Sequence, residues 1–245
     1  MAECRIRGHF RVNGRKVTIR VAPVTTPRAS NTGTPLGNAA IAFQGIVRAI
    51  DHADLKRARL AVVDVAERLA IPLQSARYAG TGGMEGPAAL AGRPKPVCLG
   101  RVFNATAIAL GNVDLGYGIL PTYQSHWRAI AGHDAVRIRG VEQTAVTTTP
   151  TVGQFIDLPA SGAFQIGSSP DGAVTADVRG DCVPVYVATT ALVLKRLVQS
   201  LGPAFTDAEL HYDAWAFADT DLPGEIGWFR GTDETSASDA ATQIV

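Results

Sequence analysis

A glycine-rich stretch, YAGTGGMEGPAALAGRPKP at residues 78–96, has the glycine density of a phosphate-binding loop and the prolines of a rigid connector. A P-loop needs a lysine and then a serine or threonine directly after its last glycine, because the ammonium and hydroxyl groups meet the phosphates and the magnesium ion. No such pair follows the glycines here, and Pro87 with the small residues after it makes a poor start for the helix of a dinucleotide-binding fingerprint. The stretch is therefore typical of a structural loop whose glycines adopt positive φ.

Cys98 is a candidate nucleophile, with His126 and His133 farther along the chain. Nucleophilic catalysis would require one of these histidines as a base and a third group to orient it. The residues around Cys98 match no known nucleophile context, and no GxSxG pattern occurs. A buried free cysteine usually packs as a small apolar side chain. We therefore expect no catalytic residue.

Two short groups carry metal-ligand residue types, AIDHAD with Asp51, His52 and Asp54, and HYDAW with His211 and Asp213. Residues two apart on a strand point to the same face, so each group could chelate a metal weakly. Solvated turn residues are the simpler interpretation. We expect neither a metal site nor a cofactor.

The tripeptide Arg179-Gly180-Asp181 matches an adhesion motif. A three-residue match arises easily by chance in a chain of this length. The end of a strand followed by a polar turn explains these residues, and we expect no role in adhesion.

The totals exclude several classes of protein. With 46% hydrophobic residues among 245, the chain can bury a core. Lys plus Arg number 23 against 22 for Asp plus Glu, and a net charge of +1 gives no strong field to hold nucleic acid or an anionic membrane. The three cysteines form no CxxC pair, which suggests a reducing compartment. No apolar run approaches the roughly 18 residues of a membrane span, and the N-terminus lacks the apolar segment of a signal peptide.

The first part of the chain, residues 1–77, has the pattern of strands. Asn13-Gly14 lies between two alternating runs, which is a strong hairpin signal. Residues 41–54 and 57–74 are rich in β-branched residues with polar interruptions. The second of these runs also fits a helical period, but we expect the two to pair as a long hairpin.

The second part mixes strands and helices. Alternating or apolar runs predict strands at 97–110, 134–146 and 173–181, with a turn at 170–172. Apolar residues at helical spacing and a Gly-Pro stop predict a helix at 187–203, with shorter helices at 206–217 and 235–245. The fold class expected is mainly β with some α (α+β). A β-rich module at 1–77 is followed by a Gly/Pro connector at 78–96 and a mixed module at 97–245.

Three stretches carry a likeness to a known group of proteins: residues 78–100, 168–181 and 227–245. They resemble tail proteins of long-tailed bacteriophages, prophages and gene-transfer-agent-like particles. The first two hold the residues that match the group's patterns: Tyr78, Gly80, Gly82, Gly83, Glu85, Gly86, Gly92, Arg93, Pro94 and Pro96, and then Gly172, Thr175, Asp177, Gly180 and Asp181. The order of elements is also similar to that of tail hub proteins, whose FxGxV strand corresponds to Phe43, Gly45 and Val47.

The resemblance implies a structural virion component of a tail tip or baseplate hub, one that acts by assembly and is not an enzyme. It implies a homo-oligomeric ring, expected to be a trimer, that contacts tube, distal tail and fibre proteins. The protein would be made in the bacterial host's cytoplasm and would reside in the virion tail. Members of the group continue past the final helix and begin before the first strands, so we expect a mixed module that is truncated at its C-terminus.

Two other functions remain open at this point. A tail-associated hydrolase of cell wall or glycan would need a pair of carboxylates or a Cys–His pair. A carbohydrate-binding tail-tip module would need exposed aromatic side chains along a groove. The candidates for that groove are Tyr117, Tyr123, Trp127, Trp215 and Trp228.

Overall fold

The computed structural model describes residues 15–21, 40–54, 57–202, 204–210 and 212–244. The chain divides into two compact units, residues 1–68 and 69–245. This division falls ahead of the boundary expected at residue 77. The reason is that Leu73 packs in the second unit, in one core with Leu197 and Ala237.

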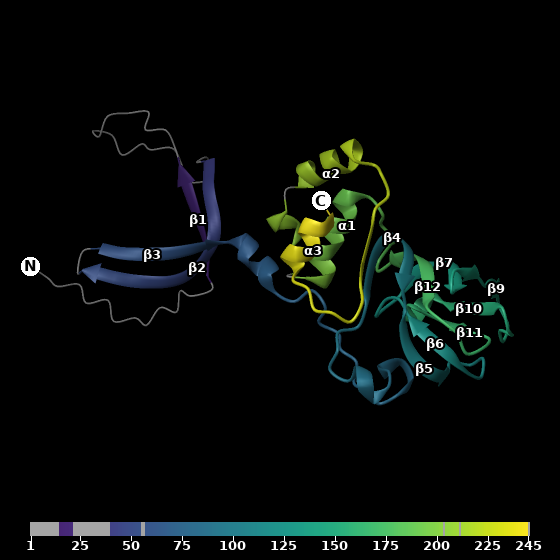
Figure 1. Cartoon of the computed structure of the whole chain (residues 1–245). Coiled ribbons are helices and arrows are strands. Elements are labelled where there is room, and N and C mark those ends of the chain that lie inside the picture. The colour runs from purple at the N-terminus through teal and green to yellow at the C-terminus, as the bar shows by residue number, and fades with distance from the viewer. Residues whose placement is uncertain (1–14, 22–39, 55–56, 203, 211, 245) are drawn as a thin grey trace, which may run out of the picture. The chain divides into compact units, whose positions relative to one another are not determined.

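The first unit contains an antiparallel sheet in the order β1-β2-β3. Its strands are β1 (Lys16–Val21), β2 (Ala40–Asp54) and β3 (Arg57–Asp64). Strands β2 and β3 form the long hairpin predicted from the sequence (Figure 1). The helical alternative holds only after β3, where Val65–Ala70 form a 3-10 helix. The hairpin predicted at Asn13-Gly14 lies outside the described residues.

Strands β1 and β3 contact different parts of β2. Strand β1 pairs with Ala40–Ile46, and β3 pairs with residues from Gly45 to Asp54. Among the described residues, the sheet is therefore three strands wide only at Gly45 and Ile46. A side chain at Gly45 would lie 2.4 Å from the Val63 carbonyl oxygen, so glycine is required where the three strands meet.

The second unit contains two five-stranded sheets, in the orders β5-β6-β11-β10-β9 and β13-β4-β12-β7-β8. The predicted runs at 97–110, 134–146 and 173–181 all lie largely in strands. The strands are β4 (Val97–Thr106), β5 (Ile108–Asp114), β6 (Ile119–Gln124), β7 (Ile130–Ile138), β8 (Val141–Glu142), β9 (Thr144–Val146), β10 (Gln154–Leu158), β11 (Ala163–Ile166), β12 (Val174–Asp181) and β13 (Gly227–Arg230).

The two sheets share one core, which we call the sheet core. Phe164 of β11 is fully buried at its centre, stacked on Tyr123 and edge-on to Phe155. Val136 of β7 and Val178 of β12 contribute from the other sheet. Burial of these side chains supplies much of the free energy that holds the sheets together.

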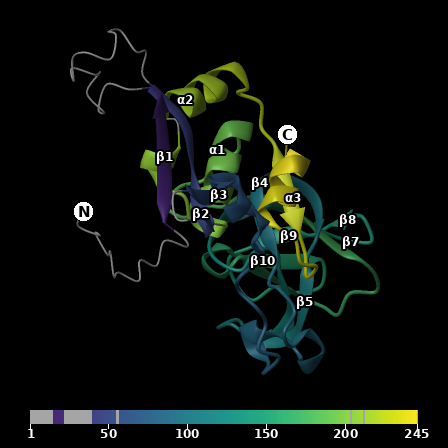
Figure 2. The same cartoon turned by 90° about the vertical axis from the view of Figure 1, so that its left-hand side faces the viewer.

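Three α-helices gather at one end of the second unit (Figures 1 and 2). They are α1 (Thr190–Arg196), α2 (Tyr212–Asp221) and α3 (Ala237–Ile244). Helix α1 continues as a π-helical turn over Leu197–Leu201 and ends at Gly202, as the sequence predicted. The Ser236 hydroxyl oxygen accepts the Asp239 N–H at 3.0 Å and so caps the start of α3.

The helices and strand β4 enclose a second core, which we call the helical core. Trp228 of β13 and Leu197 pack there with Val97 and Leu99 of β4. Cys98, between those two residues, points to the opposite face and belongs to the sheet core. Strand β4 is therefore the wall that the two cores share, because alternate side chains of a strand face opposite sides. The mostly β architecture with three helices is an α+β fold.

Two phenylalanines test the position of the sheet core. Phe164→Ala should lower the free energy of unfolding by about 3–5 kcal/mol, because it leaves a cavity among buried rings. Phe103→Ala, at a side chain 61% exposed, should change it by less than about 0.5 kcal/mol. Urea unfolding followed by tryptophan fluorescence checks both, since Trp127, Trp215 and Trp228 all lie in the second unit. Equal losses for the two variants would contradict this assignment of the core.

Candidate functional site

The loop at residues 78–96 is anchored by Tyr78. The ring is buried against Leu110 and Val113 of β5, and its hydroxyl donates to Gln124 Oε1 at 2.7 Å. Burial raises the pKa of Tyr78, and the nearby charge of Glu85 adds to this effect. The phenol is thus a neutral hydrogen-bond donor that fixes the loop to the second unit.

Glu85 closes the loop from within. Its carboxylate accepts from Lys95 Nζ at 2.6 Å and from the Ala79 N–H at 3.0 Å. The hydrogen bond from Lys95 is the main cause that lowers the pKa of Glu85. The Lys95 ammonium also lies 5.3 Å from the centre of the Tyr78 ring, so the loop's one lysine is held by groups of the loop itself.

The loop glycines take the positive φ that the sequence predicted. Their φ angles are 73° at Gly80, 91° at Gly82, 59° at Gly83, 67° at Gly86 and 75° at Gly92. The N–H groups of Gly80 and Gly82 donate to the carbonyls of Glu85 and Gly86. Because these amides are paired inside the loop, they offer no donors to a phosphate.

The end of the stretch folds back on its beginning. The Arg93 carbonyl accepts from the Tyr78 N–H at 3.0 Å, and the Pro96 carbonyl accepts from the Trp127 N–H at 3.0 Å. Pro94, which is buried, pairs with Arg77 as an isolated β-bridge. The stretch expected to connect two modules therefore lies within the second unit and packs on it.

The second group of family-like residues lies on or beside β12. The Asp177 carboxylate accepts hydrogen bonds from Arg137 Nη1 and Nη2, each at 2.8 Å, and from the Asn104 N–H at 2.9 Å. The hydrogen bonds from Arg137 are the main cause that lowers the pKa of Asp177. Gly172 leaves room for the Arg139 side chain, where a Cβ would lie 2.3 Å from Cγ. Thr175 is half-buried in β12, where it pairs with β4 and β7.

Asp181, at the end of β12, has a side chain that is 0% exposed. It accepts from Arg128 Nε and Nη2 at 2.8 and 2.7 Å, and from Arg196 Nη1 at 2.8 Å. Burial acts to raise the pKa of Asp181, but contacts with His126, Arg128 and Arg196 outweigh it and hold the pKa well below its usual range. An Asp buried in this way cannot reach a receptor, so Arg179-Gly180-Asp181 is a strand end and not an adhesion motif.

Cys98 and His126 meet in the structure, but not as a nucleophile and its base. Both side chains are fully buried, and His126 Nδ1 accepts from the backbone N–H of Cys98 at 3.0 Å. Burial raises the pKa of the Cys98 thiol, and burial also lowers the pKa of His126. A neutral thiol beside a neutral imidazole is a packing arrangement.

A grouping that the sequence analysis missed joins Ser125, His133 and Asp157. His133 Nδ1 lies 2.7 Å from Asp157 Oδ1, and His133 Nε2 lies 3.1 Å from Ser125 Oγ. This is the order of groups in acyl-transfer triads. Here, however, Ser125 is 0% exposed, while the Asp157 side chain is 29% exposed. The serine faces the interior and the carboxylate faces outward, which is the reverse of what attack by serine requires.

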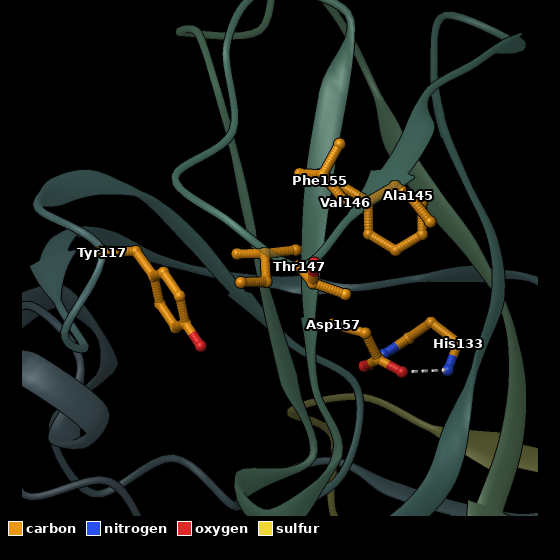
Figure 3. Close-up of a pocket in the computed structure, with 8 residues that line it drawn as sticks. Tyr117, His133, Ala145, Val146, Thr147, Phe155 and Asp157 are labelled. Atoms are coloured by element: carbon orange, nitrogen blue, oxygen red, sulfur yellow. Dashed lines mark hydrogen bonds and ion pairs between the residues drawn. The ribbon is translucent and has the colours of Figure 1, made fainter.

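The carboxylate of Asp157 opens on a pocket of about 350 Å³. Figure 3 shows Tyr117 on one side of this pocket and Asp157 with His133 on the other. Ala145, Val146 and Phe155 add apolar walls. Tyr117 is thus the member of the predicted aromatic set that lines the pocket. Of the others, Tyr123 and Trp228 are buried, and Trp127 and Trp215 are half-buried.

The predicted metal-ligand residues lie in two elements. Asp51, His52 and Asp54 belong to β2 and Asp213 to α2, whereas His211 lies outside the described residues. In the part of the chain that the structure describes, no three His, Cys, Asp or Glu residues come together as a metal site. Nor does any helix in that part have the length and apolar character to cross a membrane.

Comparisons of this chain with protein-family models, with curated proteins and with solved structures found no match.

Two glycines of the 78–96 loop form a matched test of its packing. Gly83→Ala should cost about 1–2 kcal/mol of unfolding free energy, because φ is +59° but nothing lies within 4 Å of the added methyl group. Gly80→Ala should cost at least about 1 kcal/mol more, because its methyl group would lie 2.6 Å from the Ala91 Cβ. Urea unfolding measures both. A smaller loss at Gly80 than at Gly83 would show that the loop does not pack as described.

Asp181 should dominate the acid sensitivity of the second unit. Its folded pKa is lowered, so its stabilising effect is present in full above the unfolded pKa near 3.9 and is lost progressively as pH falls from there through the lower folded pKa. Asp181→Asn should cost about 3–5 kcal/mol at neutral pH and roughly 1 kcal/mol less near pH 3, where this loss has begun. Asp134→Asn, in a more exposed ion pair with Arg179, should cost about 1 kcal/mol or less. Urea unfolding at both pH values checks this, and a pH-independent loss in Asp181→Asn would contradict it.

Proposed function

We propose that this chain is a structural component of a phage-type tail, located at the tail tip or baseplate hub, and that it acts by assembly and not by catalysis. The assignment to a tail rests on the resemblance of residues 78–100, 168–181 and 227–245 to tail proteins. The tail-hub-like order of a β-rich module and a mixed module belongs to the same proposal.

The geometry of the family-like residues supports a structural role. Three of their polar side chains have partners within the chain: Tyr78 pairs with Gln124, Glu85 with Lys95, and Asp177 with Arg137. Side chains that bind a substrate usually present unsatisfied groups to a cleft. Residues paired in this way stabilise a fold, which is what an assembly protein requires of them.

The observation that carries the proposal is the shortage of core in the first unit. Among the residues of this unit whose burial is described, Val47 is the one large apolar side chain that is buried, at 5% exposure. The sheet is a two-stranded ribbon along most of β2, and such ribbons are marginally stable alone. A unit built in this way gains its stability from surfaces outside itself.

The open edge of β2 is where another strand could add. On the side of β2 that pairs with β1, residues 48–54 pair with no other strand among the described residues. An unpaired edge of this length is a template for a strand from a neighbouring subunit. In a closed symmetric ring, the backbone N–H and C=O groups of every such edge can pair with a neighbouring subunit. We propose a trimeric ring, made in the bacterial cytoplasm and incorporated into the virion tail, with tube, distal tail and fibre proteins as its neighbours.

The groupings that resemble enzyme sites favour this proposal over a hydrolase. Cys98 and Ser125, the two possible nucleophiles beside a histidine, are both 0% exposed. A nucleophile must contact its substrate, so either residue would need a rearranged core.

The assembly proposal predicts that the full chain forms a ring through β2. Light scattering should give a mass that is a multiple of the 25.7 kDa chain, and negative-stain electron microscopy should show closed rings. Ala49→Lys should shift the mass toward the monomer, because a lysine on an edge strand opposes pairing. The control is Ala109→Lys, at an exposed strand residue of the second unit, which should leave the mass unchanged. A monomer at every concentration would overturn the proposal.

The assignment to a tail has a separate test. Gold-labelled antibodies against this chain should bind at one tip of tailed particles purified from a lysate of the bacterium that carries the gene. If the chain forms rings but no tailed particle is labelled, the proposal of ring assembly remains and the location in a tail is overturned.

A further inference from the structure

The pocket in front of Asp157 has a carboxylate and no cationic side chain in its lining. Arg179, whose guanidinium reaches Gly132 near Asp157, pairs with Asp134. Asp157 is the one Asp or Glu in the lining, and no Lys or Arg lines the pocket. Among the described residues, its carboxylate forms ion pairs or hydrogen bonds with His133 and with no lysine or arginine. A partly exposed carboxylate in a pocket with largely apolar walls attracts a positive charge.

The carboxylate is held in a fixed orientation. The backbone N–H of His133 donates to Oδ2 at 3.1 Å, and the ring Nδ1 lies 2.7 Å from Oδ1. With Nδ1 as the donor, Nε2 accepts from the Ser125 hydroxyl at 3.1 Å. The hydrogen bonds that link Ser125, His133 and Asp157 therefore hold the carboxylate in place. Little conformational entropy of the Asp157 side chain is lost when a ligand binds.

The rest of the lining suits the hydrocarbon part of a ligand. Phe155, Val146 and Ala145 provide apolar contacts, and Tyr117 stands opposite Asp157 with its hydroxyl end directed into the pocket (Figure 3). An aromatic side chain and a carboxylate on facing walls both favour an organic cation, the first by contact with its hydrocarbon part and the second by its charge.

We propose that this pocket binds an organic cation, an alkylammonium or guanidinium group on an aliphatic stem. An anion would be repelled by Asp157, and a neutral sugar would offer hydrogen bonds to Asp157 but no opposite charge. The stem lies along Tyr117, Val146 and Phe155, and the charged head lies at the Asp157 carboxylate. This proposal is independent of a role in a tail.

Such a cation comes either from a free amine or from a lysine or arginine of another protein. Strand β9 bears on the choice, because Ala145 and Val146 line the pocket and β9 is the last strand of its sheet, paired only with β10 among the described residues. An extended segment that pairs along β9 would add backbone hydrogen bonds to the contact made by its cationic side chain.

The test is a titration of the full chain followed by NMR, with probes of stated chemistry. The first probe is lysine blocked as its N-acetyl methylamide, and the second is the same compound acetylated on Nζ, which keeps the stem but removes the charge. Methyl glucoside represents neutral sugars, and the pentapeptide Gly-Gly-Lys-Gly-Gly, with blocked ends, presents the lysine in an extended segment. The charged lysine should bind and shift the resonances of Tyr117 and His133, whereas acetyl-lysine and glucoside should not. Tighter binding of the pentapeptide identifies a protein segment as the source, and equal binding identifies a free amine.

Variants locate the binding in this pocket. Asp157→Asn should weaken binding of the charged lysine by about tenfold or more, because a hydrogen bond to a charged group is lost. Asp171→Asn, at an exposed carboxylate of a different pocket, is the matched control and should bind normally. Tyr117→Phe keeps the ring and should bind within about twofold of the parent, whereas Tyr117→Ala should lose about two- to fivefold.

Three results would overturn the proposal. The first is the absence of any saturable shift with the charged lysine, and the second is equal binding of the lysine and its acetylated form. The third is unchanged binding in Asp157→Asn. If Asp157→Asn fails to fold, as judged by its unfolding curve, the affinities of the two Tyr117 variants test the proposal instead. Equal affinities of Tyr117→Phe and Tyr117→Ala would then contradict the proposal.

Discussion

The buried carboxylate of Asp181 is the contact on which the second unit most depends. It ends β12 and binds Arg128, between β6 and β7, and Arg196, in helix α1. Arg196 donates as well to the carbonyls of Val183 and Val185. One side chain thus connects the sheets to the helices and to the segment between them. Removing either partner of a buried ion pair leaves an uncompensated charge, so the loss of any one of these residues should destabilise the fold strongly.

The two units are stabilised in different ways. The second has three apolar clusters and internal partners for its buried charges, while the described residues of the first form ribbons that meet only at Gly45 and Ile46. Hydrophobic stabilisation grows with the apolar area removed from water. Among the described residues, the second unit therefore buries far more apolar surface than the first.

Elements that depend on local pattern could be predicted from the sequence. Alternation at 173–181 predicted β12, and helical spacing before Gly202 predicted α1 and its end. The contacts of the 78–96 loop could not be predicted, because Tyr78 and Gln124 are 46 residues apart and no periodicity relates them. The same holds for Ser125, His133 and Asp157. His133 lies in β7, Asp157 lies in β10 and Ser125 follows β6. They meet because the two sheets pack face to face, which a search for local motifs does not detect.

Strand β4 has a consequence for how the second unit unfolds. Val97 and Leu99 belong to the helical core, and Cys98 between them belongs to the sheet core. Displacement of β4 would open both cores at once, so we expect the loss of this strand to unfold the sheets and the helices together. Insertion of one residue ahead of Val97 would reverse the two faces of β4 and mispack both cores at once.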